Sequence, residues 1–191
     1  MKVLLVFGTR PEAIKMYPLI KEMKRHSGII SKVCLTAQHR EMLDQVMNQF
    51  DICADYDLNL MKEGQTLSDI TIGVLSGLDK IFSTEKFDVV LVHGDTTTSF
   101  AALLSAFYHK IPVGPVEAGL RTYDLHSPYP EEFNRQAVDI YTQFYFAPTE
   151  LAKRNLIKEG KKDKDIYVTG NTVIDALQTT IDETYVNEHL Q

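Results

Sequence analysis

The sequence has few cysteines, no block of basic residues and no long hydrophobic run. Its two cysteines, Cys34 and Cys53, lack metal-ligand spacing, so we expect reduced thiols in a cytoplasmic protein. Lysine and arginine total 20 against 26 acidic residues, and the net charge of -6 argues against a nucleic-acid or anionic-membrane partner. No apolar stretch is long enough to cross a bilayer or to form a signal-peptide core. The G-x-G-x-x-G pattern is also missing, which argues against NAD.

The chain does contain a regular alternation of short apolar runs and longer amphipathic segments. Strands are expected at Val3–Phe7, Ser31–Thr36, Val89–His93, Pro112–Val116, Phe144–Ala147 and Ile166–Thr169. Several of these runs are almost continuously hydrophobic, as strands buried on both faces of a parallel sheet are. Helical spacing between them implies crossover connections. The predicted fold class is α/β, with a Rossmann-like, doubly wound parallel sheet.

One domain accounts for most of the chain. The 191 residues, 44% of them hydrophobic, suffice for one substantial core. We predict a domain over residues 1–177, followed by a polar segment, 178–191, that is a terminal segment or a truncated interdomain linker. Pro18 falls inside the first helical pattern and predicts a kink or a restart there.

Three acidic residues follow expected strands or open the next helix: Asp95, Glu117 and Glu131. The carboxyl ends of parallel strands share one crevice, where ligands bind. Carboxylates converging there suggest proton-transfer chemistry on a bound substrate. They could also suit Mg²⁺, but no metal-binding loop pattern supports that, and we predict no metal. His93 closes a buried strand and is interpreted as a satisfied core residue.

Each acid also has a structural interpretation, which the sequence leaves open. Asp95 could cap the helix that follows it, because aspartate is a preferred N-cap. Glu117 could form a buried ion pair with Arg121. Glu131 and Arg135, four residues apart, could form a surface pair on one helix face.

The first turn, Gly8-Thr-Arg-Pro, follows the first strand and opens a helix. Free backbone N–H groups and the helix dipole would favour a phosphate there, with Arg10 and Lys15 as cationic side chains. An ordinary strand-to-helix turn with a solvent-facing arginine is the equally weighted alternative.

Six segments together resemble a known family. They are Gly8-Thr-Arg-Pro-Glu-Ala-Ile-Lys, Gln38-His-Arg-Glu-Met-Leu, His93-Gly-Asp-Thr-Thr-Thr, Val116-Glu-Ala-Gly-Leu-Arg-Thr, Pro130-Glu-Glu-Phe-Asn-Arg and Val168-Thr-Gly-Asn-Thr. In this collinear order they resemble the amino-terminal half of the non-hydrolysing UDP-N-acetylglucosamine 2-epimerases. The resemblance implies one half of a two-domain, glycosyltransferase-B-like architecture, and hence a missing carboxyl-terminal domain.

The resemblance also implies roles for single residues. Those matching the family's catalytic residues are Asp95, Glu117 and Glu131, and those matching its substrate-binding residues are Arg10, Lys15 and Arg135. A possible activator site would include Gln38 and Glu41, although the family's arginine at a nearby position is Gly64 here. The family needs no cofactor or metal, its substrate is UDP-N-acetylglucosamine, and its members are usually homodimers.

The implied reaction epimerises C2 of the sugar by eliminating UDP and adding it back. C2 carries an acetamido group and no hydroxyl, so the enzyme cannot epimerise it by transient oxidation at C2. The C2–H bond is also barely acidic. Elimination across C1 and C2 avoids direct deprotonation of an unactivated carbon. Two other interpretations remain: a non-catalytic nucleotide-sugar binding module, and a hydrolysing epimerase that releases UDP and N-acetylmannosamine.

Overall fold

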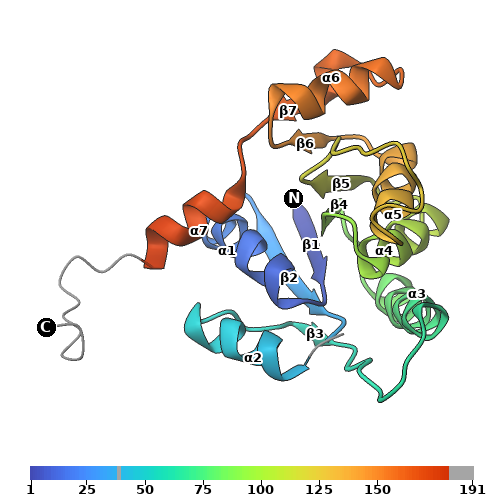
Figure 1. Ribbon diagram of the computed structural model, residues 1–191. Helices are drawn as coiled ribbons and strands as arrows, with labels where there is room; N and C mark the ends of the chain where they lie inside the picture. The colour runs from blue at the N-terminus through green and yellow to red at the C-terminus, as the bar shows by residue number, and fades with distance from the viewer. Residues whose placement is uncertain (38–39, 181–191) are drawn as a thin grey trace, which may run out of the picture.

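A seven-stranded, all-parallel sheet forms the centre of the computed structural model, which describes residues 1–37 and 40–180 (Figure 1). The strands are β1 (Lys2–Phe7), β2 (Ile30–Leu35), β3 (Tyr56–Asp57), β4 (Val89–His93), β5 (Val113–Val116), β6 (Tyr145–Ala147) and β7 (Ile166–Val168). Their order is β3-β2-β1-β4-β5-β6-β7. The chain therefore runs outward in both directions from a switch point between β1 and β4, where open α/β sheets bind ligands.

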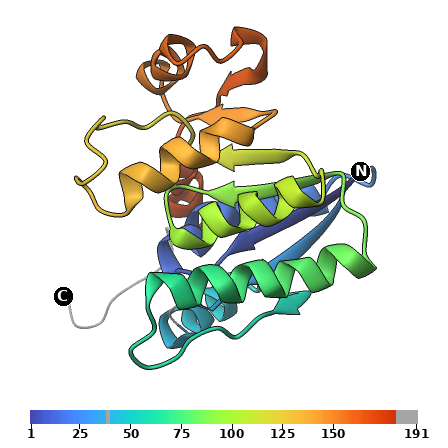
Figure 2. The ribbon, with the colours of Figure 1, turned by 90° about the vertical axis from the view of Figure 1, so that its right-hand side faces the viewer.

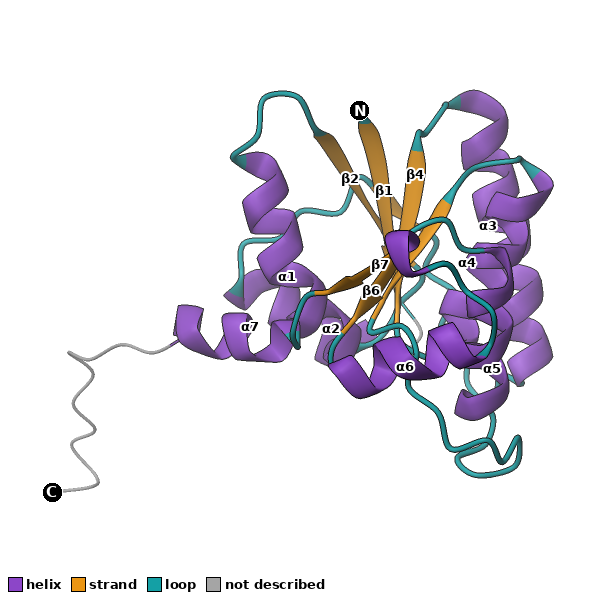
Figure 3. Ribbon diagram, turned by 90° about the horizontal axis from the view of Figure 1, so that it is seen from above, coloured by secondary structure: helices purple, strands orange, loops and turns teal. Residues whose placement is uncertain are grey.

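Helices cover both faces of this sheet (Figures 2 and 3). They are α1 (Arg10–Lys24), α2 (Arg40–Gln49), α3 (Leu67–Thr84), α4 (Thr97–Tyr108), α5 (Glu131–Val138), α6 (Glu150–Lys158) and α7 (Thr172–Thr180), with short 3₁₀ helices at Asp139–Tyr141 and Asp163–Asp165. Helix α4 packs between α3 and α5 on one face, and α1 packs against α2 and α7 on the other. Helix α6 contacts β6 and β7.

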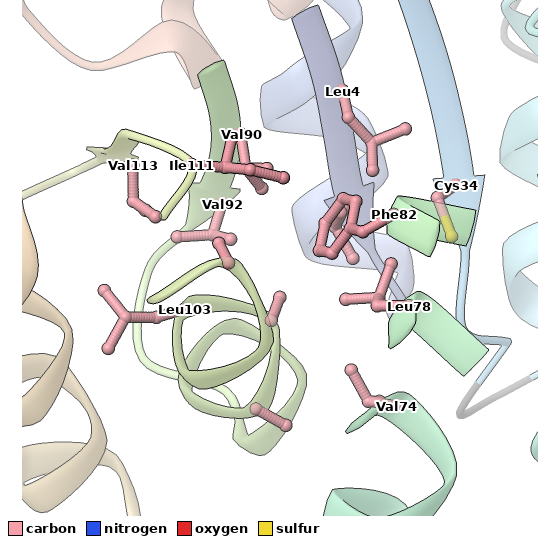
Figure 4. Close-up of a cluster of buried hydrophobic side chains, with 14 of the residues drawn as sticks. Leu4, Cys34, Val74, Leu78, Phe82, Val90, Val92, Leu103, Ile111 and Val113 are labelled. Atoms are coloured by element: carbon pink, nitrogen blue, oxygen red, sulfur yellow. The ribbon is translucent and has the colours of Figure 1, made fainter. Parts of the chain in front are cut away.

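Alternate side chains of the buried strands supply two separate cores. Leu4 of β1 and Val90 and Val92 of β4 point toward α3 and α4 (Figure 4). Their sequence neighbours, such as Leu5 and Leu91, pack on the α1 side. Each fully buried aliphatic side chain contributes about 1.5–3 kcal/mol, so this two-sided burial holds the carboxyl ends of β1, β4 and β5 rigidly in place.

The structure confirms all six expected strands and the α/β fold class. It adds β3, a two-residue edge strand too short to give a sequence pattern. Helix α1 runs without a break through Pro18, so the predicted restart is wrong. Helix α7 reaches Thr180, and residues 181–191 lie outside the described part, so the domain boundary stays a prediction. Within the described ranges, no helix has the length and hydropathy needed to cross a membrane.

Candidate active site

Asp95 and Glu117 lie at the carboxyl ends of neighbouring strands. In the β4–β5 pair His93 is level with Val116, and the Gly94 N–H donates to the Val116 carbonyl at 3.0 Å. Asp95 comes two residues after β4, and Glu117 directly follows β5. Because both strands end together, the two acids emerge at one edge of the sheet, as the sequence predicts.

Glu117 is held by a lysine from the other side of the switch point. Its Oε1 accepts a hydrogen bond from Lys15 Nζ at 2.7 Å and a longer one from Asn171 Nδ2 at 3.4 Å. The Glu117 backbone has φ 71°, a left-handed conformation that is rare for a residue with a side chain. Strain of this kind clusters at functional sites, where surrounding contacts hold it.

Arg121 is not the partner of Glu117, so that structural interpretation is wrong. Its guanidinium is buried and pairs with Asp139 at 2.7 Å and with Glu159 at 2.7 Å. Burial raises the pKa of Asp139, and the Arg121 charge opposes that rise. This buried pair ties the loop after β5 to the end of α5 and to α6, which is a structural role.

Asp95 has its own cation, Arg135 of α5. Arg135 Nη2 lies 3.4 Å from Asp95 Oδ2, and the Asn134 side chain donates to the Asp95 carbonyl at 2.9 Å. Burial raises the pKa of Asp95, Arg135 lowers it, and the charges of Glu117 and Glu131 raise it. Asp95 therefore lies within electrostatic range of both other predicted acids.

The structural interpretations of the other two acids are also wrong. Thr96, not Asp95, is the N-cap of α4, and its hydroxyl accepts from the Ser99 N–H at 3.1 Å. Glu131 is the first residue of α5, as expected. The Arg135 side chain, however, contacts Asp95 and lies 3.1 Å from Glu132 rather than forming the expected Glu131 pair.

His93 departs from the satisfied core residue that the sequence suggested. It is 4% exposed, and among the described residues its Nε2 has no hydrogen-bond partner. That nitrogen lies 3.8 Å from Glu117 Oε2, beyond hydrogen-bond reach. Burial, helped by the Lys15 charge, lowers the pKa of His93 to about 3. A neutral imidazole therefore lies beside Glu117 Oε2.

Glu12 is a fourth carboxylate at this edge, which sequence reasoning missed. Its Oε2 accepts from the Gly8 N–H at 2.9 Å and from the Thr9 N–H and hydroxyl, both at 2.8 Å. Two N–H groups expected to be free for a phosphate are thus occupied, and that expectation is corrected. The signal was the Thr9-x-x-Glu12 spacing of a capping box.

Arg10 opens α1 with an exposed side chain. Together with Thr9, Pro11 and Met42 it lines a cavity of about 500 Å³. This turn follows β1, next to β4 in the sheet, so Arg10 belongs to the same edge as the acids. No described contact joins its guanidinium to the acids, and its role rests on position.

The structure describes one of the two predicted activator residues. Gln38 lies outside the described residues, and Glu41 is exposed in the first turn of α2. Cys34 is buried and Cys53 exposed, and both are free thiols. Within the described ranges, no group of three or more His, Cys, Asp or Glu residues is arranged to hold a metal ion.

Comparison with known proteins gives concordant matches. Residues 21–191 match the family model described as UDP-N-acetylglucosamine 2-epimerase. The UDP-N-acetylglucosamine 2-epimerase of Neisseria meningitidis serogroup A is 60% identical over 183 residues, 96% of this chain and 49% of the relative. The enzyme of the same name from Bacillus subtilis is 59% identical over 97% of this chain and 49% of its own.

Solved structures agree with the sequence matches. A crystal structure of the Neisseria meningitidis epimerase bound to UDP-GlcNAc superposes with a TM-score of 0.90 at 61% identity, covering 94% of this chain and 49% of that one. A lipopolysaccharide outer core galactosyltransferase is 12% identical with a TM-score of 0.62, covering 90% and 46%, and so shares only the fold.

The chain spans about half the length of the curated relatives it matches. Those matches cover 96% and 97% of this chain. By sequence and by structure, the chain belongs to the UDP-N-acetylglucosamine 2-epimerase family.

Proposed function

We propose that this chain is the amino-terminal half of an enzyme that reversibly converts UDP-N-acetylglucosamine into UDP-N-acetylmannosamine. The observation that carries the proposal is the pairing of two acids with two cations at one sheet edge, Glu117 with Lys15 and Asp95 with Arg135. A relative of known structure, 61% identical, is described as bound to UDP-GlcNAc. That substrate offers both a diphosphate for the cations and a sugar carbon for the acids.

The reaction proceeds by loss of UDP from C1 together with the proton on C2. The C1–O bond breaks with its electron pair leaving on UDP, the C2–H pair forms the C1=C2 bond, and a carboxylate takes the proton. UDP then adds back at C1 while a carboxyl group delivers a proton to the other face of C2. Acid/base groups and electrostatic stabilisation of charge are the needs of such a sequence.

The site residues divide accordingly. Asp95, Glu117 and Glu131 are the proposed catalytic groups, because carboxyl groups can take up and deliver the C2 proton and Asp95 and Glu117 follow neighbouring strand ends. Arg10, Lys15 and Arg135 are the proposed substrate-binding groups, because guanidinium and ammonium groups bind diphosphate oxygens. Neither step requires a redox cofactor or a metal.

A missing carboxyl-terminal domain is part of the proposal. A cavity of about 340 Å³ lies at the amino-terminal ends of β1, β4, β5 and β6, on the α1 side of the sheet and at the end opposite the acids. Apolar side chains line most of it, and two of them, Met1 and Phe144, are 61% and 41% exposed. Exposed apolar surface of this kind marks contact with further protein. The relatives are about twice as long as this chain, which supports a second half of the protein as the partner that covers this surface.

The oligomeric state, the cellular location and the activator site are proposed from the same family. We propose that the complete enzyme works as a homodimer in the cytoplasm. We place an activator site near Gln38 and Glu41. The arginine that the family has near this site is replaced here by Gly64, where an added Cβ would meet no atom within 4 Å.

Product analysis tests the function. Residues 1–191 are fused to the corresponding second half of the Bacillus subtilis relative, and the fusion is incubated with UDP-N-acetylglucosamine under proton NMR. We expect a mixture containing UDP-N-acetylmannosamine. Asp95→Asn, Glu117→Gln and Glu131→Gln should each slow its formation by about 10²-fold or more, because an amide cannot exchange the proton.

Two other outcomes would replace the proposal. Free N-acetylmannosamine with UDP would identify a hydrolysing epimerase. Saturable binding of UDP-N-acetylglucosamine without turnover would identify a nucleotide-sugar binding module. The unfused chain, run in parallel, shows whether one half alone retains activity.

A further inference from the structure

Glu12 makes more hydrogen bonds than a helix cap requires. It is 2% exposed and accepts four bonds in all. Three come from its own turn, from Gly8 and Thr9, to Oε2. The fourth comes from the Thr96 hydroxyl, 84 residues away, to Oε1 at 2.7 Å.

That fourth bond joins the two turns that carry the site. One turn, after β1, holds Arg10 and leads into the helix of Lys15. The other, after β4, holds Asp95, whose sequence neighbour is Thr96. The Thr96 hydroxyl accepts from the Ser99 N–H at 3.1 Å and donates to Glu12. The same hydroxyl therefore caps α4 and hydrogen-bonds to the turn after β1.

A second capping box in the same chain shows what a cap alone looks like. In α3, Asp69 Oδ2 accepts from the Thr66 N–H at 2.8 Å and from its hydroxyl at 2.6 Å. The Asp69 side chain is exposed and its described bonds are all within its own turn. Glu12 has the same local bonds, but it is buried and is bonded to a second strand-end turn.

We propose that Glu12 is a positioning residue, which fixes the cationic β1–α1 turn relative to the acid-bearing β4–α4 turn before substrate arrives. Its carboxylate occupies the Gly8 and Thr9 N–H groups, so that turn is ordered from within. The role for turnover rests on the proposed function, whereas the linkage between the turns does not. Catalytic groups held in place by buried hydrogen bonds tolerate little displacement, since about 1 Å can cost 10²-fold in rate.

The linkage is tested on the chain as it stands, by amide hydrogen exchange. In Glu12→Ala, exchange at Ser99 should rise at least about tenfold relative to Leu103, deeper in the same helix, because the Thr96 hydroxyl loses its acceptor. Asp69→Ala removes a matched cap and should leave that ratio unchanged. Thr96→Val supplies the reciprocal test if Glu12→Ala does not fold: exchange at Thr9 should rise.

The kinetic role is tested in the fusion. Glu12→Ala should lower kcat by about 10- to 100-fold with a smaller change in KM, and Asp69→Ala should not. Glu12→Gln should restore most of kcat, since its amide oxygen can accept the three local bonds and its NH₂ group can donate to Thr96.

Two results would overturn the proposal. In one, Glu12→Ala matches Asp69→Ala in both exchange and kcat. In the other, Glu12→Gln is as impaired as Glu12→Ala. If the unmutated fusion gives no epimer, the proposed function fails, and the exchange ratios alone still decide whether Glu12 links the turns.

Discussion

Acid should destabilise this protein through His93. Its buried imidazole has a pKa lowered to about 3 from an ordinary 6.5, because burial and the Lys15 charge oppose protonation. In the unfolded chain the same group binds a proton near its ordinary pKa. The contribution of His93 to the free energy of unfolding is therefore fully present above pH 6.5. It is lost progressively as the pH falls toward 3.

The size of the effect follows from those two pKa values. At pH 5 the unfolded state is protonated at His93 and the folded state is not, which lowers the free energy of unfolding by about 2 kcal/mol relative to pH 7. Other titrating groups add their own pH dependence. A His93→Gln variant removes only the imidazole and leaves those groups in place, so the difference between the two proteins isolates the effect.

Urea unfolding at pH 7 and at pH 5 measures this difference. Circular dichroism is the suitable signal, because the chain has no tryptophan. We expect the loss between pH 7 and pH 5 to be about 2 kcal/mol smaller in His93→Gln than in the unmutated chain. Equal losses in both proteins would show that His93 takes up a proton in the folded state, and would refute a buried neutral imidazole beside Glu117.

Three further substitutions have defined expectations. Lys15→Met leaves the Glu117 carboxylate without its cation and should lower the free energy of unfolding by about 1–3 kcal/mol, with Lys15→Arg as the control; an unchanged value would contradict the ion pair. Arg121→Met leaves a buried carboxylate unpaired and should cost about 3–5 kcal/mol in urea unfolding; a cost below 1 kcal/mol would contradict it. Gly119→Ala places Cβ 2.4 Å from a backbone carbonyl at φ 82° and should cost about 2–4 kcal/mol, whereas Gly28→Ala, in open space, should be nearly neutral.

The sheet was predictable because its strands carry their own signal. Runs such as Val89–His93 are hydrophobic at every position but the last and are buried on both faces, and a short, nearly continuous apolar run of this length is the pattern of a strand in a parallel sheet. The two residues of β3 carry no such signal. Its position depends on pairing with β2, which is a tertiary contact.

The acids at the strand ends were predictable, but their partners were not. Sequence reasoning assigns partners by proximity and so paired Glu117 with Arg121, four residues away. The fold instead brings Lys15 across 102 residues. Glu12 was missed for a related reason: an acid in the first helical turn has a sufficient local explanation, and only the fold reveals the bond from Thr96.

We propose that carboxyl groups at this sheet edge exchange the C2 proton of a nucleotide sugar. The most direct test is the rate at which deuterium enters C2 when the fusion acts on UDP-N-acetylglucosamine in heavy water. We predict one deuterium at C2 of the epimer. In Asp95→Asn and Glu117→Gln, the rate at which deuterium enters should be lower than in the unmutated fusion by about 10²-fold or more. Deuterium entering at an unchanged rate in both variants, or an epimer that keeps its original C2 proton in every turnover, would show that these carboxyl groups do not exchange the C2 proton.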